Sequence, residues 1–218
     1  MRRAKAGAPC VVSVAEHTGW AHLVCVSARG KVPDVIERRR VTLIDRGLPT
    51  QPYEHDTRAM REDEAMDLIA RVNASVFACT ARALERVVSE LAPACTVVAL
   101  AIRKPPFPSI PKSVAAVHAS YPLLCSADGM LYQQAICRAA TRLKLAVQLC
   151  QRGDESARAA EQLGVTPGDI EAFVAGSGRP AGPPWTQEHR RAFAAGIAAL
   201  APHVRGRLSL ESAHKPAD

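Results

Sequence analysis

The sequence predicts one α/β domain with a central mixed sheet of about five strands, three antiparallel and then parallel ones, flanked by helices. Short apolar or alternating runs separated by turn residues fill positions 10–45. A helical pattern over 61–91 leads into an apolar run at 95–102, and a later helical stretch leads into another at 145–150. Tight turns join antiparallel strands and helices join parallel ones, so both directions occur in one sheet.

The first three strands are expected at 10–17, 20–27 and 35–45. Thr18 and Gly19 separate the first two, which predicts a hairpin. The third strand alternates enough to have one solvated face. Pro49 and Pro52 follow it, and proline cannot donate to a strand ladder, so the strand must stop before them.

A long helix is expected over 61–91, because apolar residues recur there at three- and four-residue spacing along one face. A break near Asn73 is left open. Pro93 ends the helix, and the run at 95–102 is apolar throughout. Such a run is typical of a strand covered on both faces, so we expect a central strand parallel to the first.

The second half of the chain contains mainly helical patterns after a proline-rich crossing at 105–111. Helices are expected at 114–120, 126–143, 157–163, 169–175 and 186–200, with a strand at 145–150 and a mobile loop at 176–184. Asp128 and Thr186 provide helix start signals. The expected organisation is a flexible N-terminus at 1–9, one domain at 10–201 and a disordered tail at 202–218.

Basic residues outnumber acidic ones, with 28 Lys and Arg against 21 Asp and Glu and a formal net charge of +7. This balance favours an anionic partner, and nucleic acid is the commonest one for a protein of this size. The candidates for phosphate contacts are Arg38, Arg39, Arg40, Arg103 and Lys104. An arginine-rich genome would give part of the same excess without a binding role, so charge alone does not identify the partner.

Seven cysteines are scattered along the chain, and none forms a CxxC pair or stands at zinc-ligand spacing with histidine. Most lie in apolar runs, so we expect buried free thiols in a reducing cytoplasm, with a disulfide framework or metal site as the alternative. No apolar stretch approaches the roughly 18 residues of a membrane helix, so no membrane partner is expected. The sequence leaves a homodimer open.

Two short motifs accompany this order of elements. Glu16 closes the first expected strand just before a glycine-containing turn, in Glu16-His-Thr-Gly19. The last expected helix opens with Glu188-His189 and continues as an alanine-rich face to Leu200. Together they resemble the ribonuclease H-like superfamily over residues 10–201, and within it the branch of the RuvC-type Holliday-junction resolvases.

The resemblance implies Mg²⁺ ions held by carboxylates at the ends of the first and fourth strands and on the last helix, where they activate water against a phosphodiester. Carried onto this sequence, it implies Glu16, His189 and Asp128 as catalytic residues and Glu16, Asp128 and Glu188 as metal ligands. Two positions depart from the family pattern. Glu16 stands where the family has Asp, and Arg103-Lys104 follows the fourth strand where the family has a carboxylate.

Each candidate also has a structural explanation. Glu16 fits a hairpin-turn carboxylate, and Asp128 fits a helix N-cap. His189 shares a helix face with Phe193, so it also fits a satisfied core histidine. Glu188 is favoured by the helix dipole alone. The catalytic hypothesis therefore requires Glu16 and His189 to face each other at the sheet.

Two functions remain in view. The first is a Mg²⁺-dependent nuclease that hydrolyses phosphodiesters in structured or duplex nucleic acid. The second is a non-catalytic ribonuclease H-like binding or scaffold protein that lacks a full acidic site, so the sequence does not decide whether the chain is an enzyme.

The sequence has no GxxxxGK[ST], no GxGxxG after a strand and no GxSxG. Nucleotide-hydrolysing and dehydrogenase functions therefore have no support.

Overall fold

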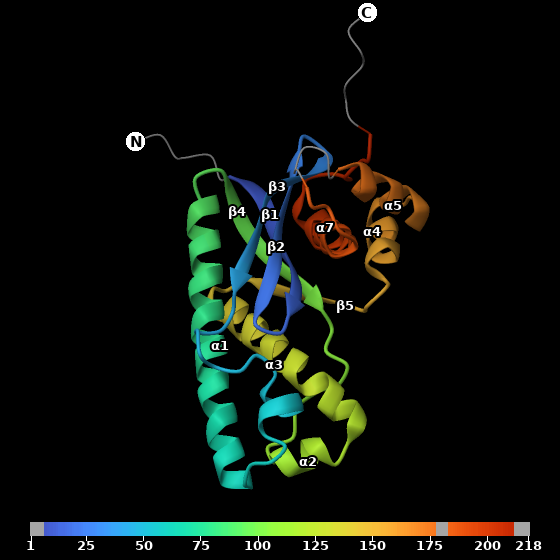
Figure 1. Ribbon diagram of the computed structural model, residues 1–218. Helices are drawn as coiled ribbons and strands as arrows, with labels where there is room; N and C mark the ends of the chain where they lie inside the picture. Colours follow the sequence, from blue (N-terminus) through green and yellow to red (C-terminus); the bar gives the residue numbers. More distant parts are fainter. Residues whose placement is uncertain (1–6, 178–182, 212–218) are drawn as a thin grey trace, which may run out of the picture.

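The computed structural model describes residues 7–177 and 183–211 and contains a five-stranded mixed sheet. The strands are β1 (Ala8–His17), β2 (Trp20–Arg29), β3 (Val32–Thr42), β4 (Cys95–Arg103) and β5 (Ala146–Cys150). They lie in the order β3-β2-β1-β4-β5 (Figure 1). Strand β2 is antiparallel to β1 and β3, while β4 runs parallel to β1 and β5. The predicted class, an α/β fold whose central mixed sheet has three antiparallel strands and then parallel ones, is confirmed.

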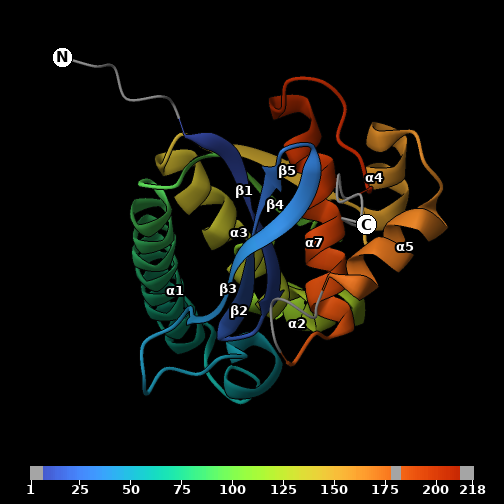
Figure 2. The ribbon, with the colours of Figure 1, turned by 90° about the horizontal axis from the view of Figure 1, so that it is seen from above.

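Helices cover both faces of the sheet, which makes three layers (Figure 2). On one face lie α1 (Glu62–Leu91) and α3 (Tyr121–Arg142). On the other lie α4 (Glu155–Leu163), α5 (Pro167–Gly176) and α7 (Gln187–Leu200). The short elements are a π-helix η1 (Pro52–Asp56), α2 (Val114–His118) and a 3₁₀ helix η2 (Ala201–His203).

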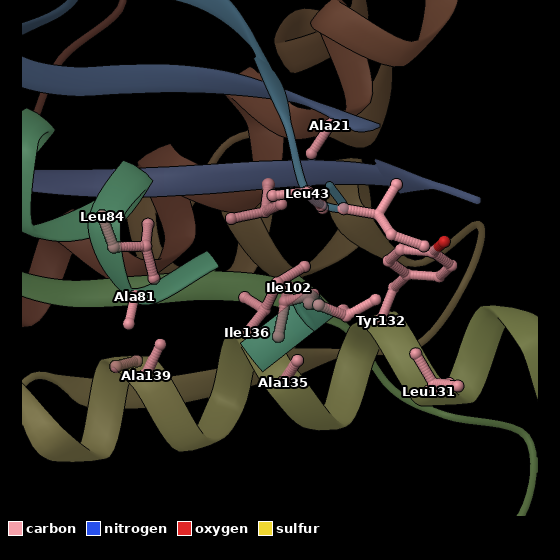
Figure 3. Close-up of a cluster of buried hydrophobic side chains, with 14 of the residues drawn as sticks. Ala21, Leu43, Ala81, Leu84, Ile102, Leu131, Tyr132, Ala135, Ile136 and Ala139 are labelled. Carbon is pink, nitrogen blue, oxygen red and sulfur yellow. The ribbon is translucent and has the colours of Figure 1, made fainter. Parts of the chain in front are cut away.

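Two apolar clusters hold these layers together, one on each face of the sheet. In the cluster under α1 and α3, Ile102 of β4 gathers with Leu84 of α1 and Ile136 of α3 (Figure 3). The other cluster joins Phe193 and Ile197 of α7 to the opposite face of the strands. A strand residue therefore contributes to one cluster or the other according to the face on which it lies.

The alternation along β1 decides which layer each residue near its end can reach. Val12 and Val14 belong to the cluster of α1 and α3, whereas Val11 belongs to the cluster of α7. Period two then places Glu16 on the α3 face and His17 on the α7 face. The hairpin register supports this, since Glu16 pairs with Ala21, which also belongs to the α3 cluster.

Strand β3 and helix α3 begin earlier than the sequence predicts, and the break left open near Asn73 does not occur. Strand β3 begins at Val32 rather than at 35, because it is an edge strand and tolerates Pro33. Helix α1 is continuous past Asn73. Helix α3 begins at Tyr121, with Pro122 in its first turn, rather than at 126. The start signal at Asp128 therefore lies inside the helix and needs another explanation.

The ends of the domain are more ordered than predicted. Ala8 pairs with Cys95, so β1 already includes the last two residues of the expected flexible N-terminus, and 1–6 lie outside the described residues. Leu208 is buried in the α7 cluster and the Ser209 N–H donates to the Lys31 carbonyl, so the expected disordered tail is wrong through residue 211. Residues 212–218, and 178–182 of the expected mobile loop, also lie outside the described part. None of the described helices is long and apolar enough to cross a bilayer.

Candidate functional site

Glu16 lies at the carboxyl edge of the parallel strands, the edge where open α/β sheets bind ligands. Its side chain is only 4% exposed. One carboxylate oxygen, Oε1, accepts a bond of 2.8 Å from the Gln133 amide of α3 and lies 2.7 Å from Nη2 of Arg103. The parallel pairing of Val14 with Ile102 brings Arg103, the next residue of β4, beside the end of β1. The buried carboxylate is therefore neutralised by a cation of the same chain.

A small hollow of about 100 Å³ opens at this edge. Glu16, Arg103 and Glu188 line it, so the structure brings together three residues that the sequence singled out. Its lining also includes Glu155, Arg152 and Arg191, which the sequence prediction missed as site residues. Three acidic and three basic side chains line the hollow, and this balance differs from the acidic site that the resemblance implies.

The carboxylates of this hollow have partners within the chain. Glu188 of α7 lies 2.9 Å from Nε2 of His17, and Glu155 accepts the Gly153 N–H at 3.0 Å. Over residues 7–177 and 183–211, no three His, Cys, Asp or Glu side chains gather in a way that could hold a metal ion. Mg²⁺ prefers several oxygen ligands and repels a neighbouring guanidinium. The residues present do not fit the Mg²⁺ site that the resemblance implies.

His189 does not face Glu16, and the predicted catalytic pair is wrong. The His189 ring is 1% exposed and packs on the α7 face of the sheet, 4.2 Å from the His22 ring and 5.6 Å from the Trp185 ring. Its Nδ1 accepts bonds from the backbone N–H and the hydroxyl of Thr186. His189 is thus a satisfied core histidine that caps α7, which is the structural alternative.

Burial, together with the nearby positive charge of His22 and Arg38, lowers the pKa of His189 to about 4, although Glu188 acts in the opposite direction. A histidine with a depressed pKa binds its proton more tightly in the unfolded chain. We therefore expect the free energy of unfolding to fall as the pH is lowered from 6.5 to 4, by up to about 1.4 kcal/mol per pH unit. Urea unfolding of the wild type and of His189→Asn at pH 7, 6 and 5 measures this. The variant should lose this part of the slope, whereas the exposed His203→Asn should keep it, and equal slopes in all three proteins would contradict the prediction.

Asp128 does not line the hollow that holds Glu16. Its two carboxylate oxygens accept the backbone N–H groups of Tyr53 and Glu54, at 3.1 and 3.0 Å. The residue therefore caps η1 from inside α3, rather than capping its own helix or holding a metal. Burial raises the pKa of Asp128 to about 6, although the two N–H donors lower it.

Asp128→Ala is expected to lower the free energy of unfolding by about 1 to 3 kcal/mol, because two largely buried N–H groups lose their acceptor. Asp128→Asn keeps one acceptor oxygen and should lose less. Urea unfolding at pH 7.5 gives both values. An alanine variant as stable as the wild type would show that the cap is dispensable.

The predicted arginine patch of β3 is divided between the two faces. Arg39 forms ion pairs with Glu37 and with Glu90 of α1, so its charge is already neutralised within the chain. Arg38 donates to the carbonyl of Pro184 and lies 5.9 Å from the Trp185 ring centroid. Arg40 lies over the Trp20 ring at 4.2 Å. The three arginines do not form one continuous phosphate-binding row.

Gln133 is a further site residue that was not predicted from the sequence. It is 1% exposed on α3, among buried residues that include Tyr132 and Ile136, and it is the polar partner of Glu16. A glutamine amid the apolar positions of a helix was the available signal, because buried amides in native proteins have hydrogen-bond partners.

No protein-family model matches the sequence. No curated protein matches it. Among solved structures, RuvC of Thermus thermophilus in complex with a Holliday junction substrate is 13% identical and covers 89% of this chain and 94% of its own, with a TM-score of 0.47. A second Thermus thermophilus RuvC structure is 12% identical over 89% and 95%, again with a TM-score of 0.47. An exopolyphosphatase from Cytophaga hutchinsonii is 14% identical over 71% and 36%, with a TM-score of 0.25.

Proposed function

We propose that this chain is a non-catalytic ribonuclease H-like protein that binds nucleic acid at the carboxyl edge of its parallel strands. The ion pair of 2.7 Å between Glu16 and Arg103 carries the proposal. A hydrolytic metal would need the Glu16 carboxylate as a ligand, and the guanidinium of Arg103 already occupies one of its oxygens. The cation at the end of β4 thus supports binding of an anion rather than of a divalent cation.

The charges around this pair favour a polyanion. Arg103 keeps 36% of its side chain exposed while it bonds Glu16. Lys104 follows it, and Arg152 and Arg191 line the hollow beside it without an ion pair to any described carboxylate. Phosphate groups of a nucleic acid backbone are the common partners of such a cluster, and each neutralised phosphate adds to the salt dependence of binding.

Fluorescence anisotropy with labelled duplex and four-way-junction DNA tests this function. We expect binding that weakens as salt rises, no gain of affinity in Mg²⁺ over EDTA, and intact DNA after incubation with Mg²⁺ or Mn²⁺. Lys104→Gln should weaken binding and reduce the salt slope by about 1. Lys31→Gln is the matched control, because this exposed lysine lies in the turn between β2 and β3 at the opposite end of the sheet.

Two results would overturn the proposal. Metal-dependent cleavage that Glu16→Gln abolishes would establish the nuclease instead. Equal weakening by Lys104→Gln and Lys31→Gln would show that the carboxyl edge is not the binding surface.

A further inference from the structure

A larger hollow lies beside the first one, between the chain that leaves β4, helix α3 and the chain that leaves β5. Its volume is about 460 Å³, and Arg103 and Arg152 line both hollows. Pro105, Pro106 and Met130 give it an apolar wall. Small-molecule sites in proteins have this size and this combination of an apolar wall with a few polar groups.

The charges of this hollow are of one sign. Arg103, Lys104 and Arg152 line it, and no Asp or Glu does. Arg103 shares its guanidinium with Glu16, whereas Lys104 and Arg152 have no described carboxylate within ion-pair distance. A phosphate group would find charge-assisted donors here from two directions, because Lys104 follows β4 and Arg152 follows β5.

Two residues of α3 in the wall are not explained by packing. Gly129 stands inside the helix, where glycine costs about 1 kcal/mol relative to alanine, yet a Cβ there would meet nothing within 4 Å. Gln133 donates its Nε2 to Glu16, which fixes the amide, and its buried Oε1 has no partner among the described residues. The glycine leaves open space in the wall, and the fixed glutamine amide forms the floor behind it.

We propose that this hollow, here called the nucleotide pocket, binds one nucleoside monophosphate unit. The phosphate contacts the three cations, and the base lies against Pro105 and Met130 in the space beside Gly129. The inference deepens the proposed function, on which it rests for a nucleotide supplied by a nucleic acid strand. A free nucleoside monophosphate has the same chemistry and fits the same pocket.

Cys125 provides a direct probe, because its thiol lines the nucleotide pocket and is the exposed one of the seven cysteines. We expect nucleoside monophosphates to slow alkylation of Cys125 by a maleimide, measured by peptide mass spectrometry, in a saturable way. The matching nucleosides, which lack the phosphate, should protect at least about tenfold less well at equal concentration. Labelling of the half-buried Cys137 is the internal reference.

Three variants locate the ligand. Gly129→Leu should remove protection, because its side chain fills open space in the wall, while Gly129→Ala should keep it. Arg152→Gln should weaken protection by the monophosphate about tenfold and leave the weak effect of the nucleoside unchanged. Arg205→Gln removes one exposed arginine beyond the far end of α7 and should change nothing. Circular dichroism and thermal unfolding show that each variant is folded.

The source of the nucleotide is distinguished by comparing free monophosphates with 5′-phosphorylated and unphosphorylated single-stranded oligonucleotides. Protection by the free monophosphate, or by the phosphorylated strand alone, supports the pocket. Absence of protection by both at about 10 mM phosphate ligand, or protection that persists in folded Gly129→Leu, overturns it. Gly129→Leu should still bind long duplex DNA in the anisotropy assay, so failure of the pocket and failure of the proposed function are separable.

Discussion

A Gly196→Val variant is expected to lose more than about 3 kcal/mol of the free energy of unfolding, so it should melt well below the melting temperature of the wild type. Gly196 lies where α7 crosses β1 and β2. A Cβ at this position would lie 2.5 Å from Cγ2 of Val26 and 3.2 Å from Oγ of Ser13. Both neighbours are fully buried, so they cannot move aside without disturbing the sheet or the helix.

Urea unfolding of Gly196→Val, followed by circular dichroism, measures this loss. Gly129→Ala is the matched control, because it is also a helical glycine and its Cβ would meet open space. It should be neutral or more stable by about 0.5 to 1 kcal/mol, from helix propensity alone. If both substitutions had the same effect, close approach of α7 to the sheet would not be what Gly196 provides.

The periodicity of the sequence predicted the elements whose burial is regular. The continuous apolar run at 95–102 is the central strand β4, and the helical spacing over 61–91 is α1. Local sequence signals gave a wrong prediction where a residue's hydrogen-bond partner lies far away in the sequence. The run from Ser126 to Asp128 predicts a helix start, whereas the Asp128 side chain bonds the segment at 52–56, far away in sequence.

The position of the site could be predicted from the sequence, but the side chains that pair with each other there could not. Glu16 at the end of β1 and Arg103 at the end of β4 follow from the strand limits, and parallel pairing places them side by side. The resemblance implied that His189 faces Glu16, because a residue of the last helix completes the family's site. The face of β1 that α7 covers depends on the path of the chain around the sheet, and no local pattern in the sequence encodes that path.

Arg103→Glu has the second large expected effect, and it tests whether the arginine takes the place of a metal. The change leaves the buried Glu16 carboxylate without its cation and adds a second carboxylate beside it. We expect a loss of about 2 to 4 kcal/mol, less than for a wholly buried pair because Arg103 is partly exposed. Two adjacent carboxylates also suit a divalent ion, so Mn²⁺ should restore about 2.7 kcal/mol at a hundredfold excess over its dissociation constant.

Two further variants separate the pair from general charge effects. Arg103→Gln also leaves Glu16 without its cation but adds no carboxylate, so it should be destabilised without any response to Mn²⁺. Lys104→Glu makes the same charge reversal one residue later, away from Glu16, and should change stability by less than about 0.5 kcal/mol. Urea unfolding with 1 mM EDTA or with Mn²⁺ compares all three with the wild type. A wild type that Mn²⁺ stabilises as much as it does Arg103→Glu would mean that Glu16 already binds a metal beside Arg103, because a ligand stabilises only a fold that binds it.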